Sequence, residues 1–154
     1  MSVSIQPVSI VAAPVLAALH KAAFTGHADW DVDFFNKLLA LPTTRGWLAL
    51  YHDAPSGFIL WQQTMDAGEI ITIAVAPEMQ GQGIGTQLMQ AYENSLIEGG
   101  VLQSILDVAE DNVGARALYE KGGYNLIHRR QKYYQRYEQG RERRIDALVF
   151  EKKL

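Results

Sequence analysis

One segment of the chain, residues 69–108, constrains the fold more than any other. It begins with an apolar run typical of a buried strand, Glu69 to Ala76, and continues from Gly83 into an amphipathic stretch that predicts a helix to about Ile97. Val101 to Val108 is again nearly continuous in apolar residues, as expected for a parallel strand buried on both faces. A strand, a helix and a parallel strand form a right-handed crossover, so the segment predicts an α/β domain.

Glycines at positions 81, 83 and 85 separate the first strand from the helix. Glycine lets backbone N–H groups approach a ligand closely, and the first turn of a helix leaves such groups unpaired and partly positive. The spacing Gln80-x-x-Gly83-x-Gly85 matches neither the Walker A loop nor the glycine pattern of dinucleotide folds. By itself it indicates either a phosphate or pyrophosphate site or a glycine-rich turn without a ligand.

The rest of the chain supplies further strands and helices around this unit. Helices are expected over Val8 to Phe24, over Asp31 to Leu41 with Asp29 or Asp31 as cap, and in a short stretch after Asp111 or Asn112. Further strands are expected over 3–7, 46–51, 57–62, 124–129 and 145–152. We therefore predict one domain over residues 1–154, with a mixed, mostly antiparallel sheet of about seven strands flanked by helices.

Composition excludes several classes of protein. There are no cysteines, which excludes disulfides, thiolate nucleophiles and Cys-type zinc sites. The first residues lack the basic start and apolar core of a signal peptide, and no run is long enough to span a membrane, so we expect a cytoplasmic protein with no membrane partner. His20, His27, His52 and His128 have no metal-ligand spacing, so we expect packing or surface roles and no metal.

Charge is distributed unevenly along the chain. The formal net charge is −3, yet residues 128–144 contain seven Lys or Arg residues against two Glu. We interpret this segment as a solvated basic loop rather than a nucleic-acid surface. An acidic remainder favours a cationic amine or a basic peptide as partner.

The segment from Glu69 to Tyr134 resembles the GCN5-related N-acetyltransferase (GNAT) family, and the element order extends the resemblance over almost the whole chain. Within the family it is similar to the bacterial ribosomal-protein-alanine N-acetyltransferases. The matching residues are Ile73-Ala74-Val75, the glycine loop, Leu106-Asp107-Val108, Asn112, Ala117-Leu118-Tyr119-Glu120, Gly123-Tyr124, Arg129-Arg130, Tyr133-Tyr134 and Asp146-Ala147. The resemblance implies a sheet that splays between its fourth and fifth strands.

The resemblance also implies acetyl-CoA as co-substrate. It assigns pantetheine to the backbone of Ile73, Ala74 and Val75, and the pyrophosphate to Gly81, Gln82, Gly83, Ile84, Gly85 and Thr86. It further assigns Asn112 to the CoA arm. Read from spacing alone, Asn112 is equally a helix N-cap, and the apolar strand residues are core.

For catalysis the resemblance implies Tyr119 as the proton donor to the departing sulfur and the position of Asp107 as the base. The family carries a glutamate at that position, and aspartate is one methylene shorter, so a bridging water suits it better than direct proton abstraction. Glu69 and Glu110 are the alternative bases. From spacing alone, Tyr119 is a core residue and Asp107 an ion-pair partner.

The implied reaction is acetyl transfer to a primary amine. An N-terminal α-amino group, with a pKa of about 8, needs a weaker base than a lysine at about 10.4, so we expect a protein N-terminus as acceptor. Ribosomal proteins, lysines and small amines remain alternatives, as does a CoA-binding module without catalysis. Tyr133 and Tyr134 stand where the family positions the acceptor, although a flexible loop explains them equally well.

Overall fold

The computed structural model describes residues 2–24 and 30–154. Its elements follow the predicted order, with a short 3-10 turn added before the third helix. They are β1 (Val3–Pro7), α1 (Ala13–Ala23), α2 (Val32–Leu39), β2 (Thr44–Tyr51), β3 (Ala54–Gln63), β4 (Gly68–Val75), η1 (Pro77–Met79), α3 (Ile84–Glu98), β5 (Gln103–Ala109), α4 (Val113–Lys121), β6 (Asn125–Glu138) and β7 (Arg141–Lys153).

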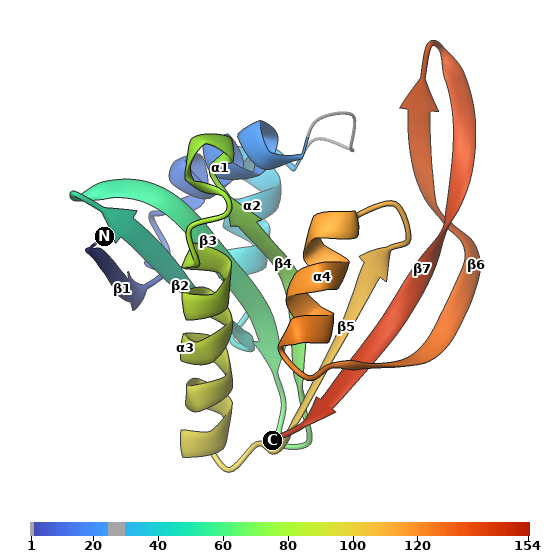
Figure 1. Ribbon diagram of the computed structural model, residues 1–154. Coiled ribbons are helices and arrows are strands. Elements are labelled where there is room, and N and C mark those ends of the chain that lie inside the picture. The colour runs from blue at the N-terminus through green and yellow to red at the C-terminus, as the bar shows by residue number, and fades with distance from the viewer. Residues whose placement is uncertain (1, 25–29) are drawn as a thin grey trace.

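The strands form one seven-stranded sheet in the order β1-β2-β3-β4-β5-β7-β6. Every neighbouring pair is antiparallel except β4 and β5. Helices α3 and α4 cover one face, and α1 and α2 cover the other (Figure 1). The predicted mixed, mostly antiparallel α/β fold is therefore confirmed.

The parallel strands β4 and β5 are paired over three residues only. Their register runs from Gly68 opposite Ser104 to Ile70 opposite Leu106 and then stops. Ile71 is an extra residue in β4, because Leu60 of β3 lies opposite Thr72 and Trp61 lies opposite Ile70. Such a bulge bends a strand and increases its twist. The sheet therefore opens beyond Ile70, as the resemblance implied.

Two apolar cores fill the two faces of the sheet. Beneath α3 and α4, the core includes fully buried Tyr92, Leu96 and Leu106. Beneath α1 and α2, it is built around Phe35 and Phe58. Asp31 caps α2 by accepting a hydrogen bond from the Phe34 N–H at 2.9 Å, whereas the alternative cap, Asp29, lies outside the described residues.

The interpretation of residues 128–144 as a solvated loop is wrong. Strand β6 continues to Glu138 and β7 begins at Arg141, so the basic segment is a long hairpin that extends beyond the rest of the sheet (Figure 1). Gln139 and Gly140 form its two-residue turn with φ of 51° and 75°. Two successive positive φ values match the twist of a hairpin, and Gln-Gly is a weak sequence signal for that turn.

Candidate active site

The glycine loop forms an open cradle at the start of α3. Gly81 and Gly83 have φ of 77° and 86°, and a Cβ built on either would meet no atom of the described residues within 4 Å. Gly83 is the N-cap of α3, and no hydrogen bond between described residues engages the backbone N–H groups of 81–86. At Gly85 a Cβ would come within 3.3 Å of Leu118 on α4, so glycine there lets the two helices approach. The loop thus offers a row of unpaired donors, which suits an anion.

Strand β4 contributes the second wall through its backbone. Ala76 N–H donates to the Ser56 carbonyl of β3 at 2.8 Å. Because backbone groups alternate along a strand, Ala74 also faces β3, whereas Ile73 and Val75 face the edge left open by β5. The Val75 carbonyl accepts a hydrogen bond from the Gln80 side chain at 3.1 Å. At the splay, therefore, the outward-facing backbone N–H and carbonyl of Ile73 form no hydrogen bond with any described side chain.

Helix α4 supplies the third wall. The Asn112 side chain caps the helix by accepting from the Ala115 N–H at 3.2 Å, so its N-cap role is present in the structure. Two turns further on, Tyr119 is only 4% exposed. Burial, reinforced by Tyr134 and Tyr92, raises its pKa well above the usual range. The hydroxyl therefore stays protonated and can act as a proton donor.

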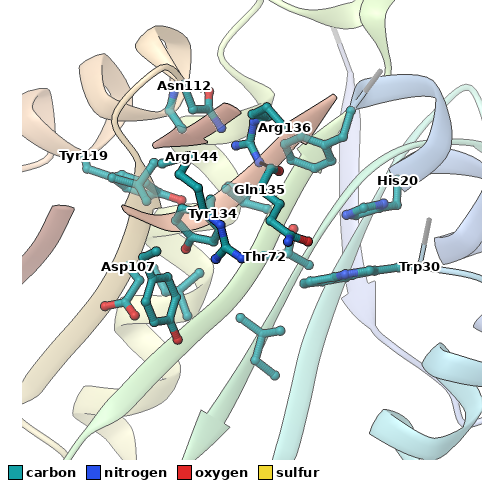
Figure 2. Close-up of a pocket in the computed structure, with 18 residues that line it drawn as sticks. His20, Trp30, Thr72, Asp107, Asn112, Tyr119, Tyr134, Gln135, Arg136 and Arg144 are labelled. Carbon is teal, nitrogen blue, oxygen red and sulfur yellow. Dashed lines mark hydrogen bonds between the residues drawn. The ribbon is translucent and has the colours of Figure 1, made fainter. Parts of the chain in front are cut away.

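Two pockets meet between these walls. The larger, about 760 Å³, is lined by Ile73, Val75, the glycine loop and the start of α4. The second, about 510 Å³, contains Asp107, Tyr119 and Tyr134 (Figure 2). Phe24, Ile73, Asn112 and Ala115 line both. A long molecule whose charged part lies on the glycine loop would therefore reach Tyr119 at its other end.

Most of the predicted co-substrate residues come together here. Ile73, Val75, Gly81, Gly83, Ile84, Gly85, Thr86 and Asn112 line the larger pocket. Ala74 and Gln82 do not: Ala74 is buried in the core under α1 and α2, and the Gln82 side chain reaches back to the Glu78 carbonyl at 3.5 Å. Gln82 would therefore contribute through its backbone N–H, whereas the backbone of Ala74 faces β3 and its side chain faces the core.

Of the three candidate bases, only Asp107 lines the second pocket. Its carboxylate is one quarter exposed and lies 3.8 Å from Arg130 Nε. Glu110 is instead paired with Arg129 at 2.9 Å, and Glu69 is exposed on β4. The geometry thus favours Asp107 over both alternatives.

The second pocket is closed by residues from distant parts of the chain. Tyr133 and Tyr134 come from β6, in a strand rather than a flexible loop, and their rings cross at 89° with centroids 5.1 Å apart. Burial, with the Asp107 charge as second cause, raises the pKa of Tyr134 to about 12. Figure 2 shows His20 and Trp30 across the pocket from Tyr134.

Several of the residues that line this pocket carried no functional indication in the sequence. His20 is 6% exposed and stacks on Trp30 with ring centroids 4.6 Å apart, so its packing role is confirmed. Arg136 and Arg144, which also line the pocket, belonged to the segment interpreted as a loop. The segment has no regular alternation of apolar and polar residues, so no local signal marked either arginine. Among the described residues, which exclude His27, no His, Asp and Glu side chains group as metal ligands would.

A split sheet, an open glycine cradle at a helix start and a pocket with a buried tyrosine define an α/β protein built to bind an extended anionic ligand. The chain belongs to the acetyltransferase (GNAT) family, whose sequence profile matches residues 14–124. No helix among residues 2–24 and 30–154 is both long and apolar enough to cross a membrane.

Similar proteins agree with this family. A ribosomal protein bS18-alanine N-acetyltransferase of Haemophilus influenzae is 38% identical over 89 residues, which is 58% of this chain and 60% of that protein. The match thus spans about three fifths of this relative. The crystal structure of the Escherichia coli ribosomal-protein-S18-alanine N-acetyltransferase superposes with a TM-score of 0.88 at 24% identity, covering 99% of this chain and 94% of that one. The structure of a GNAT family acetyltransferase from Elizabethkingia anophelis with acetyl-CoA bound superposes with a TM-score of 0.79 at 22% identity. The superposition covers 99% of this chain and 98% of that one.

Proposed function

We propose that this protein transfers an acetyl group from acetyl-CoA to a primary amine, with the N-terminal α-amino group of a protein as acceptor. The observation that carries the proposal is the meeting of two pockets at Ile73 and Asn112. One pocket presents unpaired backbone N–H groups to an anion, and the other holds a protonated tyrosine and a carboxylate. The family membership gives this arrangement its reaction class.

The residues around the larger pocket fit CoA. The N–H groups of residues 81–86 would bind the pyrophosphate, since glycine leaves the cradle open and the start of α3 carries partial positive charge. The outward backbone of Ile73 and Val75 would pair with pantetheine at the open edge of β4. Acetyl-CoA supplies the activated acyl group.

In the second pocket, Asp107 and Tyr119 would divide the proton transfers. The reaction converts an ammonium and a thioester into an amide, a thiol and one released proton. Asp107, directly or through a water molecule, would take the proton from the acceptor ammonium. The amine nitrogen then bonds to the carbonyl carbon, the carbon–sulfur bond breaks, and Tyr119 would donate a proton to the departing sulfur. The nitrogen loses its second proton as the amide forms, and that proton returns Tyr119 to its neutral state. The raised pKa of Tyr119 means that its hydroxyl is protonated at neutral pH.

Two observations support a protein N-terminus as acceptor. The relative from Haemophilus influenzae is named for an alanine of ribosomal protein bS18. An α-amino group also loses its proton at a pKa of about 8, within reach of a carboxylate relayed by water. More specifically, we propose that the acceptor is the N-terminus of a ribosomal protein.

The charges of the hairpin argue against a nucleic-acid partner. Arg129 and Arg136 each lie within 3.2 Å of a carboxylate, and Arg143 lies 3.7 Å from Glu138, so much of the basic segment is paired within the protein. A cytoplasmic location remains our prediction.

The test is incubation of the protein and acetyl-CoA with a soluble proteome, with acetylated sites identified by mass spectrometry. New acetylation at N-termini, absent with Tyr119→Phe, supports the proposal. Acetylation confined to lysines would replace the acceptor and keep the reaction. Acetyl-CoA binding without thiol release for any amine would instead indicate a CoA-binding module.

A further inference from the structure

The charged residues that line the second pocket, where we propose that the acceptor binds, have a net charge opposite in sign to that of the whole chain. The protein carries a formal net charge of −3, from which a basic acceptor would be expected. Apart from His20, the titratable side chains lining the pocket with a formal charge at neutral pH are Asp107, Arg136 and Arg144. The local field that an acceptor meets is therefore set by one carboxylate and two guanidinium groups.

The charge of Arg136 is already compensated. Its Nε and Nη2 atoms lie 3.2 and 3.3 Å from the two oxygens of Asp111, and its side chain is 9% exposed. It also lies over the Tyr134 ring at 5.5 Å. Arg136 is therefore a buried structural cation with little capacity for a further anion.

Arg144 is placed differently. Its Nε donates to Glu142 at 3.1 Å, and the same Glu142 oxygen also accepts from the Gln135 side chain at 3.0 Å. Its side chain is about half exposed, and within the described part of the chain its two terminal Nη groups have no hydrogen-bond partner. Figure 2 shows the Arg144 side chain reaching into the pocket between Tyr134 and Thr72. Two free NH₂ groups on a planar fork match the geometry of a carboxylate.

Building on the proposed function, we infer that Arg144 is a specificity-determining residue that binds a carboxylate a few atoms from the acceptor amine. In a protein acceptor this carboxylate is the side chain of an Asp or Glu at the second position. Asp107 attracts the ammonium and Arg144 attracts the carboxylate, so the pocket selects an acceptor with both charges. Arg130, which is half exposed beside Asp107, adds to the positive field. A basic second residue would instead face Arg144 and be repelled.

The experiment compares three peptides that differ only at the second residue, Ala-Glu, Ala-Gln and Ala-Lys, in the wild type, Arg144→Gln and Arg141→Gln. Arg141 is the matched control because it lies on the same strand, is exposed and does not line the pocket. We expect kcat/KM for the Glu peptide to exceed that for the Gln peptide about tenfold, as one charge-assisted contact would give. The Lys peptide should be acetylated more slowly than the Gln peptide.

The substitution at Arg144 should bring the Glu-to-Gln ratio close to one, whereas Arg141→Gln should preserve it. The inference is overturned if the wild type acetylates the Gln peptide as well as the Glu peptide, or if Arg144→Gln slows all three peptides equally and leaves their ratios unchanged. Absence of acetylation of every peptide would contradict the N-terminal acceptor itself. Comparing free alanine with alaninamide tests a second source of the carboxylate, the α-carboxylate of a free amino acid. Acetylation of alanine in preference to alaninamide, with no turnover of any peptide, would assign the contact to that group.

Discussion

The guanidinium of Arg136 forms a two-point ion pair with the carboxylate of Asp111, at 3.2 and 3.3 Å. This contact joins the hairpin of β6 and β7 to the turn between β5 and α4. Asp111 precedes the cap Asn112 and lines the larger pocket, where its charge would oppose a phosphate if it were not paired. One ion pair therefore holds the hairpin in place beside the second pocket and neutralises an acid near the proposed CoA site.

Asp111→Ala should destabilise the protein because it leaves a buried guanidinium without its carboxylate. Breaking a fully buried pair costs about 3–5 kcal/mol, and since one third of the Asp111 side chain is exposed we expect about 2 kcal/mol. Urea unfolding measures this cost. The double variant Arg136→Leu with Asp111→Leu should be less destabilised than Asp111→Ala, because no charge remains unpaired. A double variant at least as unstable as the single one would contradict this account.

Tyr119→Phe should lower kcat about 100-fold, which is typical of a lost general acid, and leave the KM for acetyl-CoA nearly unchanged. The matched control is Tyr124→Phe. The Tyr124 hydroxyl lies 2.8 Å from Ser104 Oγ and 3.2 Å from a Glu93 carboxylate oxygen, away from both pockets. That control should reduce stability and spare kcat. Equal losses of kcat in both variants would indicate a packing role for Tyr119.

The pH profile of kcat/KM with an alanine peptide should rise and then level off. The rising limb reports loss of the acceptor's proton, at a pKa of about 8 for an α-amino group. Burial raises the pKa of Tyr119 above its usual value near 10, so its acid form persists as the pH rises. We therefore expect no decline in rate below pH of about 10. A decline in kcat/KM that begins near pH 8 or 9 would exclude Tyr119 as the proton donor.

Gly83→Ala should raise the KM for acetyl-CoA because alanine resists a φ of 86° at the N-cap of α3. Gly100, at the other end of the same helix, has φ of 76° and open space around it, so Gly100→Ala imposes the same backbone strain outside both pockets. Each variant should lose about 1–2 kcal/mol of stability. The two are compared by titration with acetyl-CoA and by urea unfolding. A similar loss of acetyl-CoA affinity in Gly100→Ala would mean that the effect comes from helix stability.

Local patterns predicted the elements that depend on local physics. The apolar run of β4, the glycines before α3 and the cap at Asn112 were all visible in the sequence, because each sets the backbone conformation within a few residues. The long hairpin was not predicted. Its turn, Gln139-Gly140, carries a weak signal, and its strands are rich in arginines whose pairing with Glu138 and Glu142 exists only after folding.

The sequence by itself determined the co-substrate half of the site, since a glycine cradle at a helix start is built from consecutive residues. The sequence already pointed to Asp107 and Tyr134 in the second pocket, but tertiary structure alone decided how they meet and which residues join them. His20, Thr72, Asp107, Tyr134 and Arg144 meet in one pocket although they span most of the chain. Only the splay of β4 from β5 and the twist of the hairpin bring them together. Their charges therefore act on a substrate as a local field that neither the composition nor the net charge of the chain reveals.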